Sequence, residues 1–260
     1  MKKICFSLLL LSSFSMMRSN VLLLEGRYQN KNIYIQNGLA NSGVGFCAYE
    51  VKVNGKVTTD EVNSTAFEID LSTYKLTMGE KVTVEIYHKE DCKPKVLNPE
   101  AFKPKPSFEI GTITINTEGL LKWNTTNESG PLPYIVEQFK WNKWVYVGTV
   151  EGVGTPEKHD YLFKVTAHSG ENKFRVKQVG FGGVNKTSNP VVYNCLIETP
   201  NYKVTDKTIN FSSDTGFEMY DPFGNVVKKG FGNVCDVSNL GKGKYYLCYD
   251  NIVTELDKRK

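Results

Sequence analysis

Residues able to carry catalytic or metal chemistry are few in this 260-residue chain. Its histidines, His88, His159 and His168, lack metal-ligand spacing, and neither an HExxH zinc motif nor a GxSxG nucleophile elbow occurs. The glycine-rich stretch 180–183 falls where a turn between strands is expected, with no helix after it to bind phosphate. We therefore predict no catalytic residues, no metal, no cofactor and no enzymatic activity.

Two adjacent acidic pairs could act as the acid and base of a glycosidase. Asp60 and Glu61 form one pair, and Glu90 and Asp91 form the other. Both pairs flank predicted turns, where acidic side chains commonly make local hydrogen bonds. This pattern favours a structural role over catalysis.

Two tryptophans and one loop are the candidate binding features. Trp141 and Trp144 lie beside a predicted turn, where their indoles could stack on a sugar or clamp a peptide. The alternative, which the pattern favours, is that one packs in a core and the other shields a hairpin. In the segment 41–47, two glycines surround Val44 and indicate a tight loop, either a contact loop or a plain connection.

Cysteines supply the candidate cross-links. In an oxidising compartment, Cys47 could pair with Cys92 within one domain. Counting back from the glycine-rich turn between them places Cys235 and Cys248 opposite each other on antiparallel strands, within reach of a second disulfide. The alternative for each pair is two small apolar core residues. Cys195 would remain unpaired.

The first twenty residues match the pattern of a secretory signal peptide. Lys2 and Lys3 precede an apolar run, 4–11, that is too short to span a bilayer as a helix. The mature chain is therefore predicted to be exported and to have no transmembrane span. Removing residues 1–20 leaves 29 basic against 28 acidic residues, a balance that disfavours nucleic acid as a partner.

The rest of the chain predicts strands. Val, Ile, Tyr, Phe and Thr gather in runs of four to eight residues bounded by Gly, Asn, Asp or Pro, which is typical of an all-β chain. Apolar and polar residues alternate at 32–36 and 82–86, as expected of half-exposed antiparallel strands, and Asn54–Gly55 is a hairpin-turn signal.

A proline-rich stretch at 93–108 and a weaker break at 196–207 divide the predicted strands into three groups. We predict three small β-sandwich domains of the immunoglobulin or fibronectin III type, at residues 21–100, 107–195 and 199–260.

The middle segment carries a family resemblance. Its clearest predicted strands are 121–123, with Trp123 as a core residue, 134–139, and 172–179 around Phe174. With these strands the segment resembles a fibronectin type III module. The resemblance implies a sandwich fold and no particular function, because such modules serve many roles.

The last segment carries a second resemblance. One strand enters the turn 221–225 and returns through 226–230, and a predicted hairpin then pairs 234–237 with 245–249. This order resembles the C-terminal sorting domain of proteins exported by the type IX secretion system of the Bacteroidetes. The matching residues are Asp221, Gly224, Asp236, Ser238, Leu240, Gly243 and Tyr245.

These resemblances imply a function for the whole chain. We expect a non-enzymatic component of the bacterial envelope that acts by protein–protein docking in type IX secretion, as an accessory, plug-like subunit of the outer-membrane translocon. Its expected location is the periplasm or the periplasmic or outer face of the outer membrane, with secretion machinery as the protein partner. The alternative is an exported surface adhesin or carbohydrate-binding protein, held by its C-terminal domain, with a glycan bound at Trp141 and Trp144.

Overall fold

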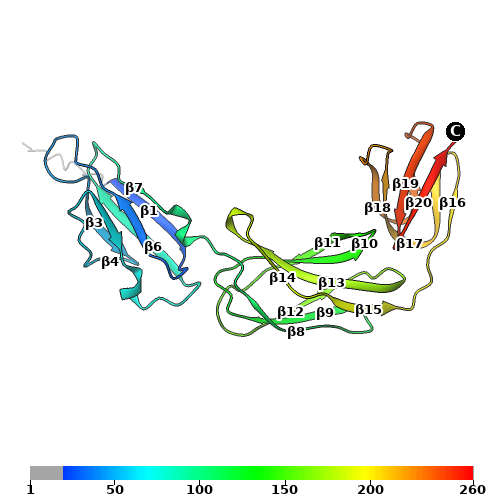
Figure 1. The fold of residues 1–260 in the computed structure, drawn as a ribbon, viewed down its shortest axis with the longest axis horizontal. Helices are drawn as coiled ribbons and strands as arrows, with labels where there is room; N and C mark the ends of the chain where they lie inside the picture. The colour runs from blue at the N-terminus through cyan, green and yellow to red at the C-terminus, as the bar shows by residue number, and fades with distance from the viewer. Residues whose placement is uncertain (1–19, 260) are drawn as a thin grey trace, which may run out of the picture. The chain divides into compact units, whose positions relative to one another are not determined.

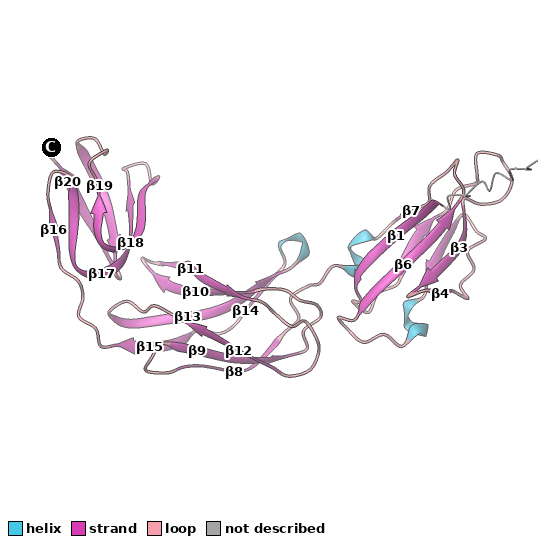
Figure 2. Ribbon diagram, turned by 180° about the vertical axis from the view of Figure 1, so that it is seen from behind, coloured by secondary structure: helices cyan, strands magenta, loops and turns pink. Residues whose placement is uncertain are grey.

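Strands dominate this chain. The computed structural model describes residues 20–259, so the predicted signal peptide lies outside the described residues except for Asn20, which begins the first strand. Within this range the helical segments are three short 3-10 turns (Figure 1, Figure 2). The predicted all-β class is therefore confirmed. No helix within residues 20–259 is long and apolar enough to cross a membrane.

The described chain forms two compact units. The second unit takes the chain from Lys103 onward, together with Arg27–Gln29 and Leu76–Glu80. The first unit takes the other described residues up to Phe102. The second and third predicted domains thus belong to the same unit.

Two sheets build the first unit, with strand orders β1-β6-β3-β4 and β5-β2-β7. Alternate residues of β2 and β6 are buried, because one face of each strand meets the core and the other meets solvent. The elements are β1 (Asn20–Arg27), β2 (Ile33–Gln36), β3 (Ala48–Val53), β4 (Lys56–Val57), β5 (Ala66–Ile69), η1 (Leu71–Tyr74), β6 (Lys81–His88), β7 (Lys95–Val96) and η2 (Pro99–Phe102).

The sequence signal for the β3–β4 turn is confirmed. Asn54 and Gly55 connect the two strands and have φ angles of 48° and 79°. A type I′ turn needs positive φ at both central positions, and Asn-Gly tolerates it. Around this hairpin the buried core is built mainly from branched aliphatic side chains: Ile33, Ile35, Val51, Val53, Ile69, Leu71, Val82, Val84 and Ile86.

The second unit begins with a sandwich of two antiparallel sheets. One sheet has the order β12-β9-β8; the other has the order β11-β10-β13-β14, and β15 also pairs with β13. This two-sheet layout is that of immunoglobulin-like and fibronectin III domains. The strands are β8 (Glu109–Ile115), β9 (Leu120–Thr126), β10 (Tyr134–Lys140), β11 (Lys143–Val150), β12 (His159–Lys164), β13 (Gly170–Val179), β14 (Asn185–Thr187) and β15 (Val191–Cys195), with η3 (Phe181–Gly183) before β14.

Aromatic side chains fill the space between these two sheets. Trp123 is 2% exposed and stacks on Tyr161 at a centroid distance of 5.4 Å, and Tyr134 packs against both rings. Phe174 is fully buried in the same cluster. The predicted core position of Trp123 is therefore confirmed, and Phe174, predicted only as part of a strand, lies in the same core.

A five-stranded sheet completes the second unit. Its order is β16-β17-β19-β20, and β18 also pairs with β17. The predicted turn 221–225 joins β17 to β18, as expected. Its core residues include Ile209, Phe211, Met219 and Leu247. The strands are β16 (Tyr202–Val204), β17 (Thr208–Tyr220), β18 (Val226–Asp236), β19 (Gly243–Tyr249) and β20 (Ile252–Lys258).

The predicted hairpin between residues 234–237 and 245–249 is wrong. Strands β18 and β19 each pair with β17, and the hairpin partner of β19 is β20. Residues Phe217–Tyr220 of β17 pair with β18 on one edge and with β19 on the other, so β17 lies between the two strands that were expected to form a hairpin.

The predicted disulfide between Cys235 and Cys248 is wrong for the same reason. In the strand register Cys235 lies opposite Ile209, and Cys248 lies opposite Glu218 and Val253. Both cysteines are buried free thiols. They match the alternative interpretation of the sequence, in which the two cysteines are small apolar core residues. Cys195 is also a free thiol and is half-buried.

Candidate functional site

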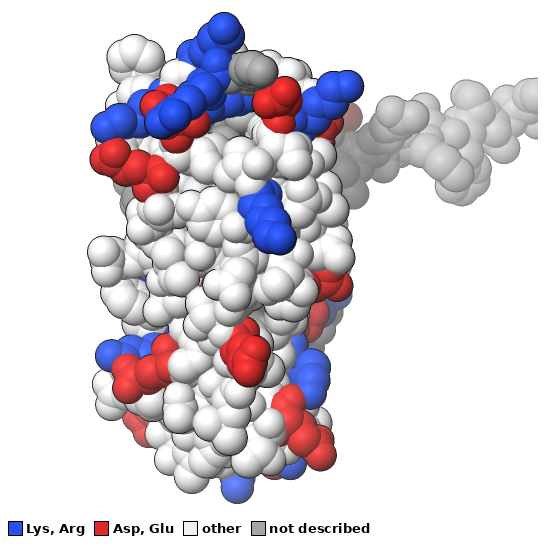
Figure 3. Space-filling view, turned by 90° about the vertical axis from the view of Figure 1, so that its right-hand side faces the viewer, with Lys and Arg blue, Asp and Glu red and all other residues white. Residues whose placement is uncertain are grey.

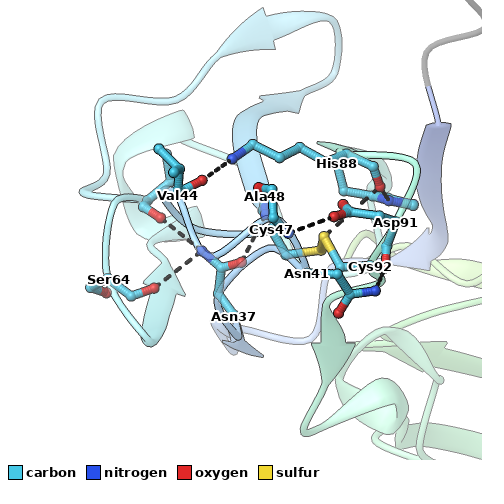
Figure 4. Close-up of a disulfide and its surroundings, with 12 residues drawn as sticks. Asn37, Asn41, Val44, Cys47, Ala48, Ser64, His88, Asp91 and Cys92 are labelled. Carbon is cyan, nitrogen blue, oxygen red and sulfur yellow. Dashed lines mark hydrogen bonds between the residues drawn. A yellow bond between two sulfur atoms is a disulfide. The ribbon is translucent and has the colours of Figure 1, made fainter.

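A disulfide stands at the base of an exposed loop in the first unit (Figure 4). Cys47 precedes β3, Cys92 follows β6, and their Cα atoms are 5.8 Å apart. This is the first of the two cysteine pairs considered from the sequence. The bond links the end of the loop 39–46 to the chain that follows β6, so the base of the loop cannot open without distorting both segments.

The loop is closed on itself by backbone hydrogen bonds. Leu39 and Phe46 form an isolated antiparallel bridge. The amide of Ala40 donates to the carbonyl of Gly45 at 3.0 Å, and the amide of Gly43 donates to Ala40 at 2.8 Å. Both glycines have positive φ, 73° and 72°, which explains why this tight turn uses glycine.

The segment after β6 holds the loop from one side. The Nζ atom of Lys89 donates to the carbonyl of Val44 at 2.7 Å, and Asp91 Oδ2 accepts the amide of Ser42 at 3.1 Å (Figure 4). The side-chain amide of Asn41 also donates to the carbonyl of Asp91. These contacts give Asp91 a structural role in holding the loop.

Asn37 holds the loop from its other end. Its side chain is fully buried, and its Oδ1 accepts the amide of Ala48 at 2.8 Å. Its Nδ2 donates to the carbonyls of Val62 and Ser64 at 3.0 and 3.1 Å (Figure 4). Asn37 thus ties three segments together. Its role could not be predicted from the sequence, because an isolated asparagine beside a glycine indicates no more than a turn.

Two apolar side chains of this loop are exposed. Val44, near its tip, is 75% exposed, and Leu39, at its base, is 59% exposed. An exposed apolar pair held in one conformation suits contact with a protein surface, since little ordering entropy is lost on binding. We call residues 39–46 the braced loop.

The other acidic pair also makes local hydrogen bonds. Asp60 accepts from the hydroxyl of Thr58 and from the amide of Asp70 at 3.1 Å. Glu61 accepts from the amide of Asn63 at 2.7 Å. These bonds shape the chain around β5, as acidic side chains near turns commonly do.

A basic side chain lies over the ring of each tryptophan. Trp141 and Asn142 have positive φ and form the two-residue turn between β10 and β11. The ammonium of Lys140 lies 4.4 Å from the centroid of the Trp141 ring. The guanidinium of Arg175 lies 4.0 Å from the centroid of the Trp144 ring. Each indole ring therefore makes a cation–π contact with a neighbouring basic side chain.

The residues of the sorting-like motif separate into two groups at opposite ends of β18. Asp221 and Gly224 shape the turn before that strand. Asp221 Oδ1 accepts the amides of Phe223 and Asn225 at 2.9 and 2.8 Å, and the hydrogen bonds from Asn225 lower the pKa of its carboxyl. Gly224 has a φ of 84°, which the turn requires.

The second group shapes the chain between β18 and β19. Asp236 Oδ1 accepts the amide of Ser238 at 2.8 Å, and this bond lowers the pKa of Asp236. The carbonyl of Leu240 accepts from the buried Lys258 ammonium at 2.8 Å. Gly243 begins β19 with a φ of 151°, and the hydroxyl of buried Tyr245 donates to Gly241 at 3.1 Å. The motif residues thus form turns and caps of the fold.

The histidines are separate from one another. His88 and His168 are buried and each contacts a neighbouring backbone carbonyl, and His159 contacts Thr155. Within residues 20–259 no group of three or more His, Cys, Asp or Glu side chains is placed to hold a metal ion. On the face shown in Figure 3, basic and acidic side chains are mixed and uncharged atoms lie between them.

Comparison with known proteins gives only distant structural likenesses. No family model matches the chain, and no curated protein matches it. The chicken CNTN1 FN1–FN3 domains are 12% identical with a TM-score of 0.28, covering 93% of this chain and 99% of that one. A tetra-tandem repeat from the extending region of a large adhesion protein is 11% identical with a TM-score of 0.31, covering 92% and 74%. Because both TM-scores are low, these likenesses carry no inference about this chain.

Proposed function

We propose that this chain is an exported, non-enzymatic protein of the bacterial envelope that acts by docking on another protein through the braced loop. The observation that carries the proposal is the exposed Val44 at the tip of a loop closed by the Cys47–Cys92 disulfide. A disulfide at this position suits an oxidising compartment outside the cytoplasm.

The braced loop would bind by placing its two exposed apolar side chains against a partner surface. Val44 and Leu39 supply the apolar area, and truncation of a few such central residues usually costs most of the binding energy. Lys89 and Asp91 hold the loop before binding, so the partner does not have to order it.

More specifically, we propose that the chain is an accessory, plug-like subunit of the type IX outer-membrane translocon. It would lie in the periplasm or on a face of the outer membrane. The support for this form is the ordered set of sorting-like residues between Asp221 and Tyr245 in the sequence. Because these residues form turns of a module that belongs to the larger unit, we propose that the last module is retained.

The test is affinity purification of the tagged chain from a host with a type IX system. We expect translocon subunits to copurify with the unaltered chain and to be lost with Val44→Asp. The matched control is Val57→Asp, since Val57 is also an exposed valine of the first unit, 58% exposed, but lies on β4 away from the loop. Failure to recover the translocon with the unaltered chain, or equal recovery with Val44→Asp, contradicts the proposal.

The competing function is that of an adhesin or carbohydrate-binding protein. Glycan-array binding that disappears with Trp144→Ala would favour it over docking. We expect no such binding, because Arg175 covers one face of that indole and the ring of Phe139 packs against it in a T-shaped arrangement. Protease treatment of intact cells separates the locations, since a periplasmic chain is protected and a surface chain is cut.

A further inference from the structure

Glu218 connects two modules of the second unit. It lies on β17, and its side chain is only 5% exposed. Its carboxylate accepts from Lys143 Nζ of β11 at 2.8 Å and from Lys229 Nζ of β18 at 3.0 Å, and the hydroxyl of Tyr220 also donates to it. Lys143 belongs to the fibronectin-like sandwich, whereas the other three belong to the last sheet.

A second carboxylate makes a parallel connection. Asp250 lies in the β19–β20 turn and is 5% exposed. It accepts the amide of Ser169 at 3.0 Å and also the hydroxyl of Ser169, directly before β13. On its own side, the amide of Asp250 donates to Thr215 Oγ1 at 3.1 Å. The Asp250 end of this connection is therefore fixed within the last module.

Turns of the two modules meet between these carboxylates. The amide of Trp141, in the β10–β11 turn, donates to Asn251 Oδ1 in the β19–β20 turn at 3.3 Å. Trp141 needs positive φ and leaves its amide outside the β10–β11 ladder, and Asn251 supplies the acceptor. The turn chemistry of both modules therefore contributes to the junction.

A buried carboxylate is stabilised by cations and hydrogen-bond donors such as those that contact Glu218 and Asp250. A carboxylate withdrawn from water destabilises the fold unless charge or hydrogen bonds replace its hydration. Glu218 and Asp250 both receive part of that compensation from the neighbouring module. Separating the modules would remove Lys143 from one carboxylate and Ser169 from the other, although water would then reach both.

We propose that Glu218 and Asp250 form a two-point latch that joins the fibronectin-like sandwich and the last module into a single rigid body. The last module is then a fixed part of the protein and not a tag on a flexible tether. This inference does not depend on the docking function or on the identity of any partner.

The test measures backbone amide residual dipolar couplings of the full chain, fitted separately for the two modules. Modules that tumble as one body give the same alignment tensor, and modules that move independently give different ones. We expect one shared tensor for the unaltered chain. For the double variant with Lys143→Met and Ser169→Ala we expect two tensors, with a smaller magnitude for the module that moves more.

The test includes a matched control for the loss of an ion pair and a single variant for the case in which the double variant does not fold. Lys244→Met removes an exposed ion pair with Glu255, 2.8 Å long, that lies within the last module, and should leave one shared tensor. Ser169→Ala alone removes one hydroxyl and should give an intermediate result if the double variant does not fold. Two tensors in the unaltered chain, or one shared tensor in every variant, would overturn the latch.

Discussion

Tyr161 donates a hydrogen bond from its hydroxyl to the buried carboxylate of Glu128 at 2.7 Å, between the two sheets of the fibronectin-like sandwich. Tyr134 donates to the same oxygen at 2.9 Å, and the amide of Gly154 donates to the other oxygen at 2.7 Å. Burial raises the pKa of both tyrosine hydroxyls, so they remain protonated donors. Neutral donors thus satisfy a carboxylate that is 1% exposed.

Glu128→Ala should therefore destabilise the second unit strongly. Two tyrosine hydroxyls and the amide of Gly154 would lose their acceptor in a buried site, which costs about 3 kcal/mol or more. Urea unfolding monitored by tryptophan fluorescence measures the loss, since Trp123 packs on Tyr161. Glu109→Ala, which removes an exposed glutamate from β8, should change the free energy of unfolding little.

Gly224 belongs to the sorting-like motif, and comparison with Gly241, which does not, tests whether the backbone conformation at this position requires glycine. A Cβ added at either position meets no atom within 4 Å, but only Gly224 has a positive φ, of 84°. Gly224→Ala should therefore cost roughly 1–2 kcal/mol from backbone strain alone. Gly241→Ala should be neutral or slightly stabilising. Thermal unfolding of both variants checks this, and equal effects would contradict it.

The features that could be predicted from the sequence are those that depend on residues close together along the chain. Alternating apolar residues identified β2 and β6, Asn54–Gly55 identified its turn, and Trp123 was recognised as core, because each depends on neighbours along the chain. The predicted pairing of Cys235 with Cys248 is wrong because it assumed that consecutive strands are neighbours, whereas β17 lies between β18 and β19 in the sheet.

Buried polar residues could not be found in the same way. Glu128 and Asn37 are among the least exposed side chains, yet their residue types predict exposure. Their partners come from several separate segments, such as Val62 and Ala48 for Asn37, and only the tertiary fold brings these together. The braced loop was recognised as a tight loop, while the contacts that hold it were not.

Removing the disulfide should loosen the first unit. Cys47 and Cys92 are separated by 45 residues, and closing a loop of that length stabilises a fold by about 2–4 kcal/mol. Replacing both cysteines by serine should lower the free energy of unfolding by that amount and speed amide exchange at Gly43. Cys195→Ser, which removes a half-buried free thiol of the second unit, should leave exchange at Gly43 unchanged.

We expect the ionised Glu218 carboxylate to stabilise the second unit, and we expect this stabilisation to be lost at acid pH. Although burial opposes ionisation, hydrogen bonds from Lys143, Tyr220 and Lys229 lower its pKa from the ordinary 4.5 to about 2. Because the folded pKa lies below the unfolded value, this contribution is complete above pH 4.5 and disappears as the pH falls toward 2. Lys140 and Cys248 are further titratable groups that interact electrostatically with Glu218.

The measurement compares the unaltered chain with Glu218→Gln by urea unfolding between pH 7 and pH 2.5. The amide cannot pair with Lys143 and Lys229 as an ion, so the variant should be less stable by about 1–3 kcal/mol near neutral pH. This difference should shrink below pH 4.5 as the carboxylate takes up its proton. Glu255→Gln, which breaks an exposed pair with Lys244, should show a small difference throughout. A difference for Glu218→Gln that stays constant down to pH 2.5 would mean that packing of the side chain, and not its charge, stabilises the junction.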